Sequence, residues 1–393
     1  MDVYSQSIEL HKKLKGKIST ETKMPIKTKE ELSLLYSPGV AQPCIEIADD
    51  ESKVYDYTIK GNTIAIISDG SAVLGLGDIK AKASIPVMEG KAALFKSFAD
   101  VNAFPICVET QDADEIIQIA KNIAPVFGGI NLEDIKAPKC FYVEEKLKEM
   151  LDIPVFHDDQ HGTAIVCLSG LVNALKVVNK KIEDIKVVVN GLGSAGVAIV
   201  KLFAVYGVKN FSLCDINGEI FSGELTPDLI DGLVDMIQER KVITDSPKLA
   251  EAIKGGDVFI GVSAANIVTK EMAESMNKDA IIFAMANPNP EIKPELAKEA
   301  GVAIMATGRS DYPNQINNVL VFPGIFKGAL DVRAKAINTE MKIAAVEALS
   351  SIISDEELSR EYIIPSPFDE RVVERISNAV KQAAIDTNVA RIK

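Results

Sequence analysis

The sequence predicts an α/β protein with three parts: an N-terminal α/β domain, a doubly wound α/β domain, and C-terminal helices that pack back onto them. Two observations support this prediction. Short apolar runs alternate with amphipathic stretches along most of the chain, which is typical of parallel sheets covered by helices on both faces. The 393 residues are also enough for two or three domains. We place the boundaries at residues 1–160, 161–330 and 331–393.

In the first part, apolar strands alternate with helices, and Pro and Gly interrupt residues 36–43, where we expect a loop or turn. The spacing of apolar residues separates the two kinds of element. The expected helices are 7–17, 86–99 and 112–123. The expected strands are 62–68 and 104–109.

The alternation restarts more regularly after Pro154, which predicts a parallel sheet with helices on both faces. The expected strands are 185–190, 211–215, 258–262, 281–285 and 303–306. Helices are expected at 162–178 and 197–206. From about residue 326 the tail is helical, and one apolar stripe along residues 372–383 gives it a face to bury.

Composition excludes several classes of partner. The 43 Lys and Arg against 56 Asp and Glu give a net charge of −13, so the surface should repel nucleic-acid phosphates and anionic lipids. We find no stretch of roughly 18 apolar residues and no apolar signal-peptide core at the N-terminus. The five cysteines are odd in number, spread widely and without a Cys-x-x-Cys pair, which predicts reduced core thiols. We expect a cytoplasmic protein with a small-molecule partner, no nucleic acid and no membrane.

A glycine-rich turn is the main cofactor signal. Gly191, Gly193 and Gly196 follow an apolar strand and open a helix, and Asp215 ends the next strand 19 residues after Gly196. This context predicts a Rossmann-type dinucleotide-binding domain rather than a glycine turn without a ligand. Asp215 would bind the adenine-ribose hydroxyls and oppose a 2′-phosphate, so NAD is favoured. NADP stays possible if Lys209 or a later basic residue binds that phosphate.

Acidic residues gather at Asp69, at Glu133-Asp134 and at Asp158-Asp159, each beside small or apolar residues. A carboxylate beside buried strands needs a cation or a solvated turn, because burying it unpaired is costly. Oxygen ligands of this kind suit Mg²⁺ or Mn²⁺. Helix N-caps and turns explain the same pattern without a metal, so both interpretations stay open at this point.

Three further residue types carry weaker signals. His157 and His161 have helical spacing, but no His-Glu-x-x-His pattern accompanies them, so we do not favour a zinc site. Small and apolar neighbours would desolvate the amine of Lys91 and lower its pKa toward that of a base. Tyr36 precedes a Ser-Pro-Gly turn, and such a ring is most often simply packed.

Taken together, these motifs resemble the malic enzyme family, in particular its short prokaryotic-type members. The matching runs occur in the family's order over most of the chain. They are Tyr36-Ser-Pro-Gly-Val, residues 68–78, residues 86–91, Asn131-Leu-Glu-Asp134, residues 157–163, the Gly191 turn, Ala286-Asn-Pro-Asn-Pro290 and residues 317–324. The resemblance implies oxidative decarboxylation of L-malate to pyruvate and CO₂ with a divalent metal and NAD or NADP.

The resemblance also implies residue roles. Glu133, Asp134 and Asp159 would bind the metal, with Asp158 in a supporting role. Lys91 would be the general base. The remaining roles that it implies are Tyr36 as general acid, Asn287 and Asn318 at substrate and nicotinamide, and Leu192, Gly193, Ser194 and Ala195 around the pyrophosphate.

Two further implications concern specificity and assembly. Larger family members carry an arginine where this sequence has Ser71, so the substrate carboxylate must find a different partner here. The family resemblance suggests a homodimer or a larger homo-oligomer, with the N-terminal segment reaching a partner's site.

Two alternatives remain. A 2-hydroxy-acid or amino-acid dehydrogenase would transfer hydride without decarboxylation, but it would have no need of the paired acids. A non-catalytic nucleotide-sensing or scaffold protein could share the fold, but it would have no need of Lys91, Tyr36 and the acids together. Metal-independent activity would favour the first, and failure to bind Mn²⁺ would favour the second.

Overall fold

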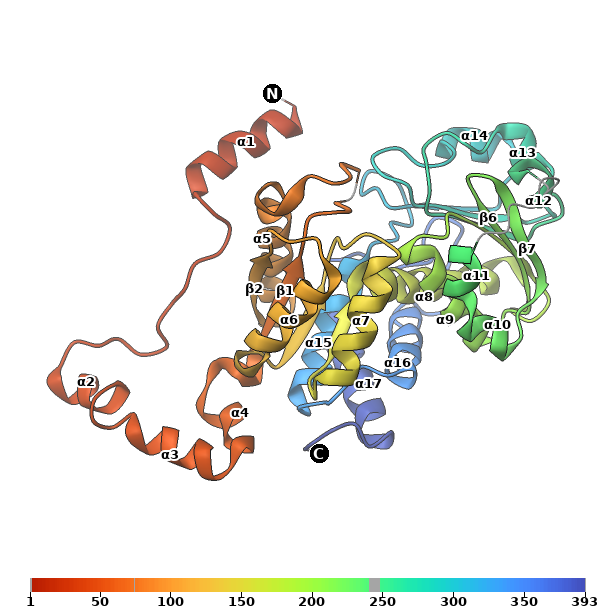
Figure 1. Ribbon diagram of the computed structural model, residues 1–393. Coiled ribbons are helices and arrows are strands. Elements are labelled where there is room, and N and C mark those ends of the chain that lie inside the picture. Colours follow the sequence, from red (N-terminus) through yellow and green to blue (C-terminus); the bar gives the residue numbers. More distant parts are fainter. Residues whose placement is uncertain (1, 74, 240–247, 393) are drawn as a thin grey trace.

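The computed structural model describes residues 2–73, 75–239 and 248–392. It contains two sheets of mainly parallel strands, connected by helices and followed by a helical C-terminal segment (Figure 1). The predicted fold class is confirmed. The long helix α8 (Asp158–Val178) leads from the first sheet to the second.

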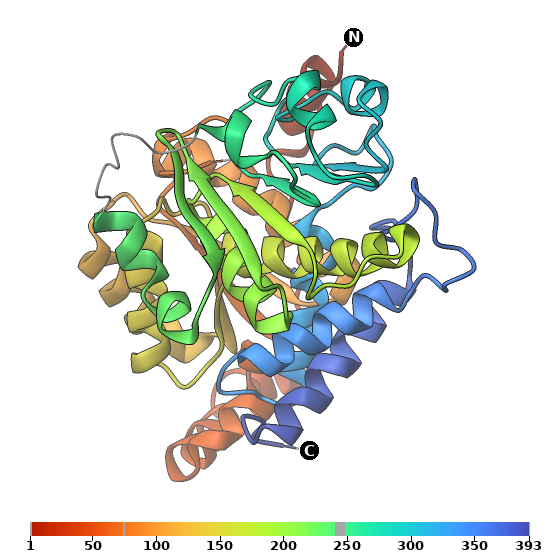
Figure 2. The ribbon, with the colours of Figure 1, turned by 90° about the vertical axis from the view of Figure 1, so that its right-hand side faces the viewer.

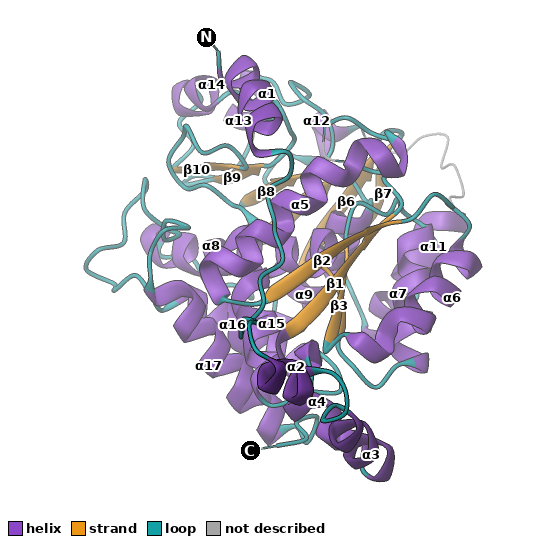
Figure 3. Ribbon diagram, turned by 90° about the vertical axis from the view of Figure 1, so that its left-hand side faces the viewer, coloured by secondary structure: helices purple, strands orange, loops and turns teal. Residues whose placement is uncertain are grey.

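The first sheet is fully parallel, with strand order β2-β1-β3-β4. Alternate residues of its central strand face opposite layers of helices, because side chains alternate across a strand. Ile64 and Ile66 join the apolar core that includes α5, whereas Ala65 and Ile67 join the core that includes α6 and α7. Figure 3 shows these helices around the strands. The strand bounds are β1 Thr63–Ser68, β2 Asn102–Cys107, β3 Gly129–Leu132 and β4 Val155–His157.

The second sheet has the order β10-β9-β8-β5-β6-β7. Chain order reverses between β5 and β8, which places a crevice at the carboxyl ends of these two strands. The edge strand β7 is antiparallel to β6, so the expected parallel sheet has one antiparallel strand. The bounds are β5 Lys186–Asn190, β6 Asn210–Asp215, β7 Gly218–Glu224, β8 Val258–Gly261, β9 Ile281–Ala284 and β10 Ile304–Thr307.

The helices between the strands agree with the predicted alternation. Three of these helices begin earlier than expected: α5 at Lys80, six residues early and with Pro86 in its interior, α8 at Asp158, four residues early, and α9 at Ser194, three residues early. The remaining bounds are α5 Lys80–Ala99, α6 Ala113–Ile123, α7 Lys139–Met150, α9 Ser194–Tyr206, α10 Pro227–Asp231, α11 Leu233–Glu239, α12 Leu249–Ala252, α13 Lys270–Glu274 and α14 Pro294–Glu299.

The C-terminal helices pack across both parts of the molecule (Figure 2). Phe322 and Phe326 lie 4.6 and 5.5 Å from Phe95 of α5, measured between ring centroids, and Phe326 also contacts Phe156 of β4. One continuous apolar core therefore joins residues of both sheets with this segment. The helices are α15 Phe322–Asp331, α16 Thr339–Ser350 and α17 Arg371–Asp386.

Much of the N-terminal arm, residues 2–57, extends away from the rest of the fold (Figure 1), although Lys17 contacts α5 and Asp56 pairs with Arg333. None of the residues in its four helices is buried. The predicted loop over 36–43 is partly wrong, because residues 41–43 form the first turn of a helix, where proline is tolerated. The helices are α1 Val3–Leu14, α2 Lys29–Leu35, α3 Ala41–Asp49 and α4 Val54–Tyr57.

Two further expectations can be compared with the fold. Within the described residues, α8 alone is long and apolar enough to cross a membrane, but 67% of its apolar window is buried. It is the core helix between the two sheets.

All five cysteines are free thiols. The expected core location holds for three of them and fails for Cys44, which is exposed on the arm, and in part for Cys107, which is half-buried.

Candidate active site

The glycine-rich turn lies at the carboxyl end of β5, and each of its glycines has a distinct physical reason. Gly191 has φ +103°, and a Cβ there would lie 2.5 Å from the carbonyl oxygen of Val262. A Cβ on Gly196 would lie 1.9 Å from the carbonyl oxygen of Gly191. Nothing lies within 4 Å of the Cβ position of Gly193, which faces open space. The turn is therefore tight at both ends and accessible in the middle.

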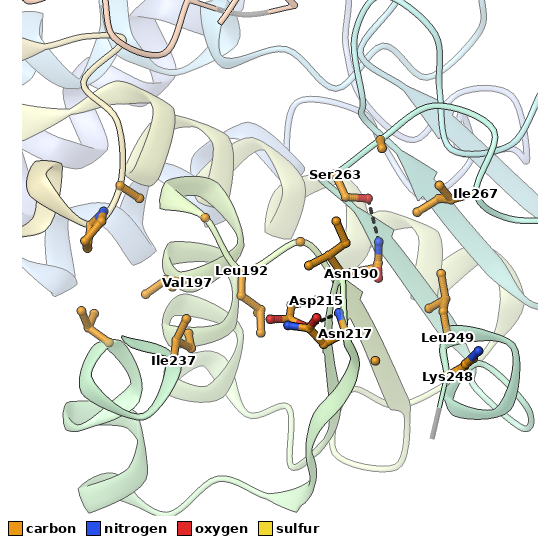
Figure 4. A pocket seen from close by; sticks show the side chains of 18 of the residues that line it. Asn190, Leu192, Val197, Asp215, Asn217, Ile237, Lys248, Leu249, Ser263 and Ile267 are labelled. Carbon is orange, nitrogen blue, oxygen red and sulfur yellow. Dashed lines mark hydrogen bonds between the residues drawn. The ribbon is translucent and has the colours of Figure 1, made fainter. Parts of the chain in front are cut away.

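This turn borders a cavity of about 1000 Å³ at the crevice where the strand order reverses (Figure 4). Leu192 and Asp215 line the cavity, and Ser194 and Ala195 open α9 beside it. Asn190 donates a hydrogen bond of 2.7 Å to the hydroxyl of Ser263 on the opposite wall. A cavity of this size and position suits a dinucleotide, with backbone N–H groups of the α9 N-terminus available to a pyrophosphate.

Glu291, which the sequence reasoning missed, connects two walls of the crevice. It is fully buried. Its Oε1 accepts the Ser263 N–H at 2.9 Å and its Oε2 accepts the Ala286 N–H at 3.0 Å. Burial raises the pKa of Glu291, and the two backbone donors oppose this shift. Gly261 leaves the space that the carboxyl group fills, since a Cβ there would lie 2.4 Å from Glu291 Cδ. Glu291 therefore fixes the loops after β8 and β9 relative to each other.

Replacing Glu291 with glutamine should raise the KM for the dinucleotide more than it lowers kcat. The amide keeps the volume but has a single acceptor oxygen, so it can hold one of the two backbone N–H groups. Loss of a buried hydrogen bond to a charged group should also lower the free energy of unfolding by about 1.5–3 kcal/mol. Steady-state kinetics and thermal unfolding test this, with the exposed Glu299→Gln as control. An unchanged KM and melting temperature would contradict the role.

Three carboxylates meet at the carboxyl end of the first sheet. Glu133 and Asp134 directly follow β3, and Asp159 lies in the first turn of α8, directly after the neighbouring strand β4. One oxygen from each residue can be chosen so that all three lie within 4.8 Å of one another. The backbone N–H of Asp134 donates to Asp159 at 2.8 Å, and Asn131 donates to Glu133 at 2.8 Å.

The electrostatics of this cluster fit a divalent cation. Burial raises the pKa of Glu133 and of Asp159, and the attraction of Lys91 only partly opposes these shifts. The single charge of Lys91 therefore does not offset the cost of burying these carboxylates together, and a cation bound between them would. Hard oxygen ligands with this spacing are the donors that Mg²⁺ and Mn²⁺ prefer.

Lys91 of α5 lies among these acids. Its Nζ is 2.9 Å from Glu133 Oε1 and 2.5 Å from Asp158 Oδ2, and 4.1 Å from the ring centroid of Phe322. Burial alone would lower the pKa of Lys91, but the charges of Asp158, Glu133 and Asp159 outweigh burial and raise it. The lowered pKa expected from apolar neighbours is therefore wrong for this arrangement, because the carboxylates come from distant parts of the sequence.

Asp158 is the buried partner of Lys91, and its position depends on a glycine. A Cβ on Gly162, one helical turn later, would lie 1.9 Å from Asp158 Oδ1. Asn318, at the start of a short 3₁₀ turn, lies beside Gly162 and Asp158, and its side chain opposes the burial-driven rise in the pKa of Asp158. The structure thus brings Asn318 to the acid cluster.

Asn287 lies after β9, with its Nδ2 3.4 Å from the Met285 carbonyl.

Asp69 and Ser71 form a separate group. The Ser71 hydroxyl donates to Asp69 at 2.6 Å and accepts the Lys136 N–H at 2.9 Å. Lys139 pairs with the other oxygen of Asp69. The charge of Asp69 is therefore balanced by lysine, and the single donor of Ser71 is already used. Ser71 does not replace the missing arginine as a partner for a substrate carboxylate.

The structure does not bring Tyr36 to the other predicted site residues within one copy of the chain. Tyr36 ends α2 on the N-terminal arm, and 68% of it is exposed. Figure 1 shows α2 and α3 well away from α5 and α8. Within a single chain, the expected general acid is missing from the site.

A Rossmann-type cofactor crevice, a carboxylate cluster and a buried lysine define an NAD(P)-dependent oxidoreductase. Comparison with known proteins identifies the family. Residues 15–114 and 109–148 match the malic enzyme N-terminal domain, and residues 160–387 match the malic enzyme NAD binding domain. The chain belongs to the malic enzyme family, whose reaction oxidises L-malate to pyruvate and CO₂ and reduces NAD or NADP.

Relatives of known name and structure are similar over nearly the whole chain. The bifunctional malic/malolactic enzyme of Bacillus subtilis is 56% identical, covering 100% of this chain and 95% of that protein. The NAD-dependent malic enzyme of Geobacillus stearothermophilus is 58% identical over 96% of this chain and 78% of its own length. The malic enzyme structure from Pyrococcus horikoshii has a TM-score of 0.91 at 49% identity, covering 100% of this chain and 93% of that one.

Proposed function

We propose that the chain carries out this reaction with NAD in preference to NADP, and with Mg²⁺ or Mn²⁺ bound by Glu133, Asp134 and Asp159. The observation that carries the metal proposal is the meeting of three carboxylates beside the buried amine of Lys91. The NAD preference rests on Asp215, whose carboxylate lines the cofactor cavity and would repel a 2′-phosphate. Lys248 also lines this cavity and is the basic side chain through which NADP could still bind.

The reaction removes a proton from the C2 hydroxyl and a hydride from C2, then releases the C4 carboxylate as CO₂ and adds a proton to C3. When bound, the divalent ion would polarise the oxygen on C2 as a Lewis acid and the nicotinamide would accept the hydride. Lys91 would accept the hydroxyl proton. It must be neutral to do so, and it becomes easier to deprotonate once Glu133 and Asp159 are engaged by a cation.

Two asparagines and a tyrosine would complete the site. Asn318, which lies beside Asp158, would orient the substrate next to Lys91. Asn287 follows a strand of the second sheet and would contact substrate and nicotinamide. Tyr36 would protonate C3 as the general acid.

Tyr36 can take this role if two copies of the chain form a homodimer in which each arm completes the partner's site. The arm carries many exposed apolar side chains, among them Tyr4, Leu34, Tyr36 and Ile45. Large exposed apolar patches are typical of association surfaces. Symmetric dimers exchange such elements reciprocally.

The cytoplasmic location expected from the sequence stays a prediction.

The first experiment mixes purified protein with L-malate, Mn²⁺ and either NAD or NADP, and follows reduced nicotinamide, pyruvate and lactate separately. We expect one pyruvate per reduced cofactor, a higher kcat/KM with NAD, and loss of activity with a chelator that added Mn²⁺ reverses. Cofactor reduction without pyruvate would favour a plain dehydrogenase. Lactate in place of reduced cofactor would indicate the malolactic reaction named for the Bacillus subtilis relative. Activity that survives chelation would contradict the metal proposal.

A further inference from the structure

A second cavity, of about 820 Å³, lies along α9 and adjoins the cofactor cavity, with which it shares Phe141, Val197 and Val234. Helices α7, α8, α9, α10, α11 and α16 contribute to it. It contains titratable groups that the proposed reaction does not use. The side chains that matter below are Glu144, Lys148, His161, Lys201 and Lys342.

A chain of hydrogen bonds crosses one wall of this cavity. Glu144 is buried, and its Oε1 lies 2.6 Å from Lys148 Nζ and 2.7 Å from His161 Nε2. On the other side of the imidazole ring, Lys342 Nζ lies 3.1 Å from His161 Nδ1. When Lys342 is protonated, its ammonium group has donors only, so Nδ1 accepts and Nε2 carries the hydrogen that is donated to Glu144. His161 is then neutral, and it adds no charge to the wall.

The charges along this wall do not balance. Glu144 supplies one negative charge, which forms an ion pair with Lys148. Among the described residues, neither Lys342 nor Lys201 has a carboxylate within 4.0 Å. Burial and then the charge of Lys148 lower the pKa of Lys342 to about 7, although Glu144 opposes the shift, and Lys201 adds to it. Lys342 therefore loses its proton easily, and a bound carboxylate would supply the counterion that keeps it protonated.

The remaining walls limit what can bind. Apolar side chains form one side, and the acids Glu145, Glu149, Asp231 and Asp235 lie at the exposed edge. These acids would repel a ligand with several negative charges. The apolar residues are Phe141, Ala164, Val197, Ala198, Leu202, Val205, Ile230 and Val234.

We propose that this cavity binds a small organic monocarboxylate, with its carboxylate paired to Lys342 and its apolar part against α9. A ligand here would touch α8 and α9, the two helices whose first turns carry Asp159 and the glycine-rich turn. The cavity is therefore a site from which an effector can act on both the metal end and the cofactor end of the active site.

Hexanoate is a suitable probe, titrated by calorimetry into the full-length protein saturated with NADH so that the cofactor cavity is filled. We expect one hexanoate per chain. Lys342→Gln keeps the size and a donor for His161 but removes the charge, and should weaken binding about 10- to 100-fold. Lys342→Arg should retain binding, and so should Lys121→Gln, a matched change at an exposed lysine on α6.

Thermal unfolding without hexanoate shows that the variants are folded, which separates lost binding from lost structure. Absence of hexanoate binding to the unmodified protein would overturn the proposal. So would equal affinity in the unmodified protein and Lys342→Gln. Binding of inorganic phosphate but not hexanoate, with the same dependence on Lys342, would overturn the assignment of a carboxylate with an apolar part.

Discussion

Replacing Lys91 with alanine should lower kcat by about 10²–10⁴-fold, the range for loss of a general acid or base, and should leave the affinity for NAD nearly unchanged. Lys91 lies on α5, which packs on the first sheet, whereas the cofactor cavity is lined by α7 and by the strands, loops and helices of the second sheet. The amine contacts Glu133, Asp158 and Phe322. Steady-state kinetics and a fluorescence titration with NADH measure the two effects separately.

The alanine variant also leaves buried acids without their cation, so it should be less stable than the unmodified protein when no metal is present. Saturating Mn²⁺ should restore much of that loss, because ligands of the folded state stabilise it. Lys96→Ala, on the same helix but paired with Asp100 at the surface, is the matched control. A large loss of NADH affinity in Lys91→Ala would count against the proposed role, and so would turnover close to that of the control.

Mixing two inactive variants should restore activity if Tyr36 acts on the partner's site. Tyr36→Phe lacks the acid and Lys91→Ala lacks the base, so each homodimer has no complete site. In a mixed dimer, one site combines the intact Lys91 of one copy with the intact Tyr36 of the other. After unfolding and refolding together, equal amounts should regain about a quarter of the original activity, since half of the dimers are mixed and one site in each is complete.

The control is each variant refolded alone, which should stay inactive. Refolding Tyr36→Phe with the double variant Tyr36→Phe/Lys91→Ala should restore nothing, because no intact Tyr36 is present. If the first mixture also stays inactive although mixed dimers form, then Tyr36 does not act across the dimer. High activity in Tyr36→Phe alone would show that it is not the general acid.

The sequence predicted the cofactor crevice well because its signal is local. The turn, the following helix and Asp215 lie within one strand-helix-strand unit, so their spacing fixes their arrangement. The acid cluster was harder to predict from the sequence. Glu133-Asp134 and Asp158-Asp159 meet because β3 and β4 are neighbours, and both strands are too short, at four and three residues, to show a periodic pattern.

The errors have a common physical origin, since each depends on contacts between distant segments. The pKa of Lys91 is raised by acids that lie far from it in the sequence. Glu291 looks like a surface residue of a Pro-rich loop, and only the fold buries it under two backbone N–H groups. Tyr36 does not reach the other site residues within one chain, and in the proposed dimer it would reach them from the partner.

The aromatic contacts of the C-terminal segment make the two sheets energetically dependent on each other. Phe322 packs on Phe95, which lies over the first sheet, and it also borders the amine of Lys91. The same continuous core reaches Phe283 in the second sheet. A chain cut after the second sheet would lose Phe322, the apolar side chain against the buried amine of Lys91, so the C-terminal segment is needed for the structure of the site. Both sheets should therefore unfold in one cooperative transition. A dinucleotide bound at the second sheet should also stabilise the acid cluster of the first sheet against unfolding.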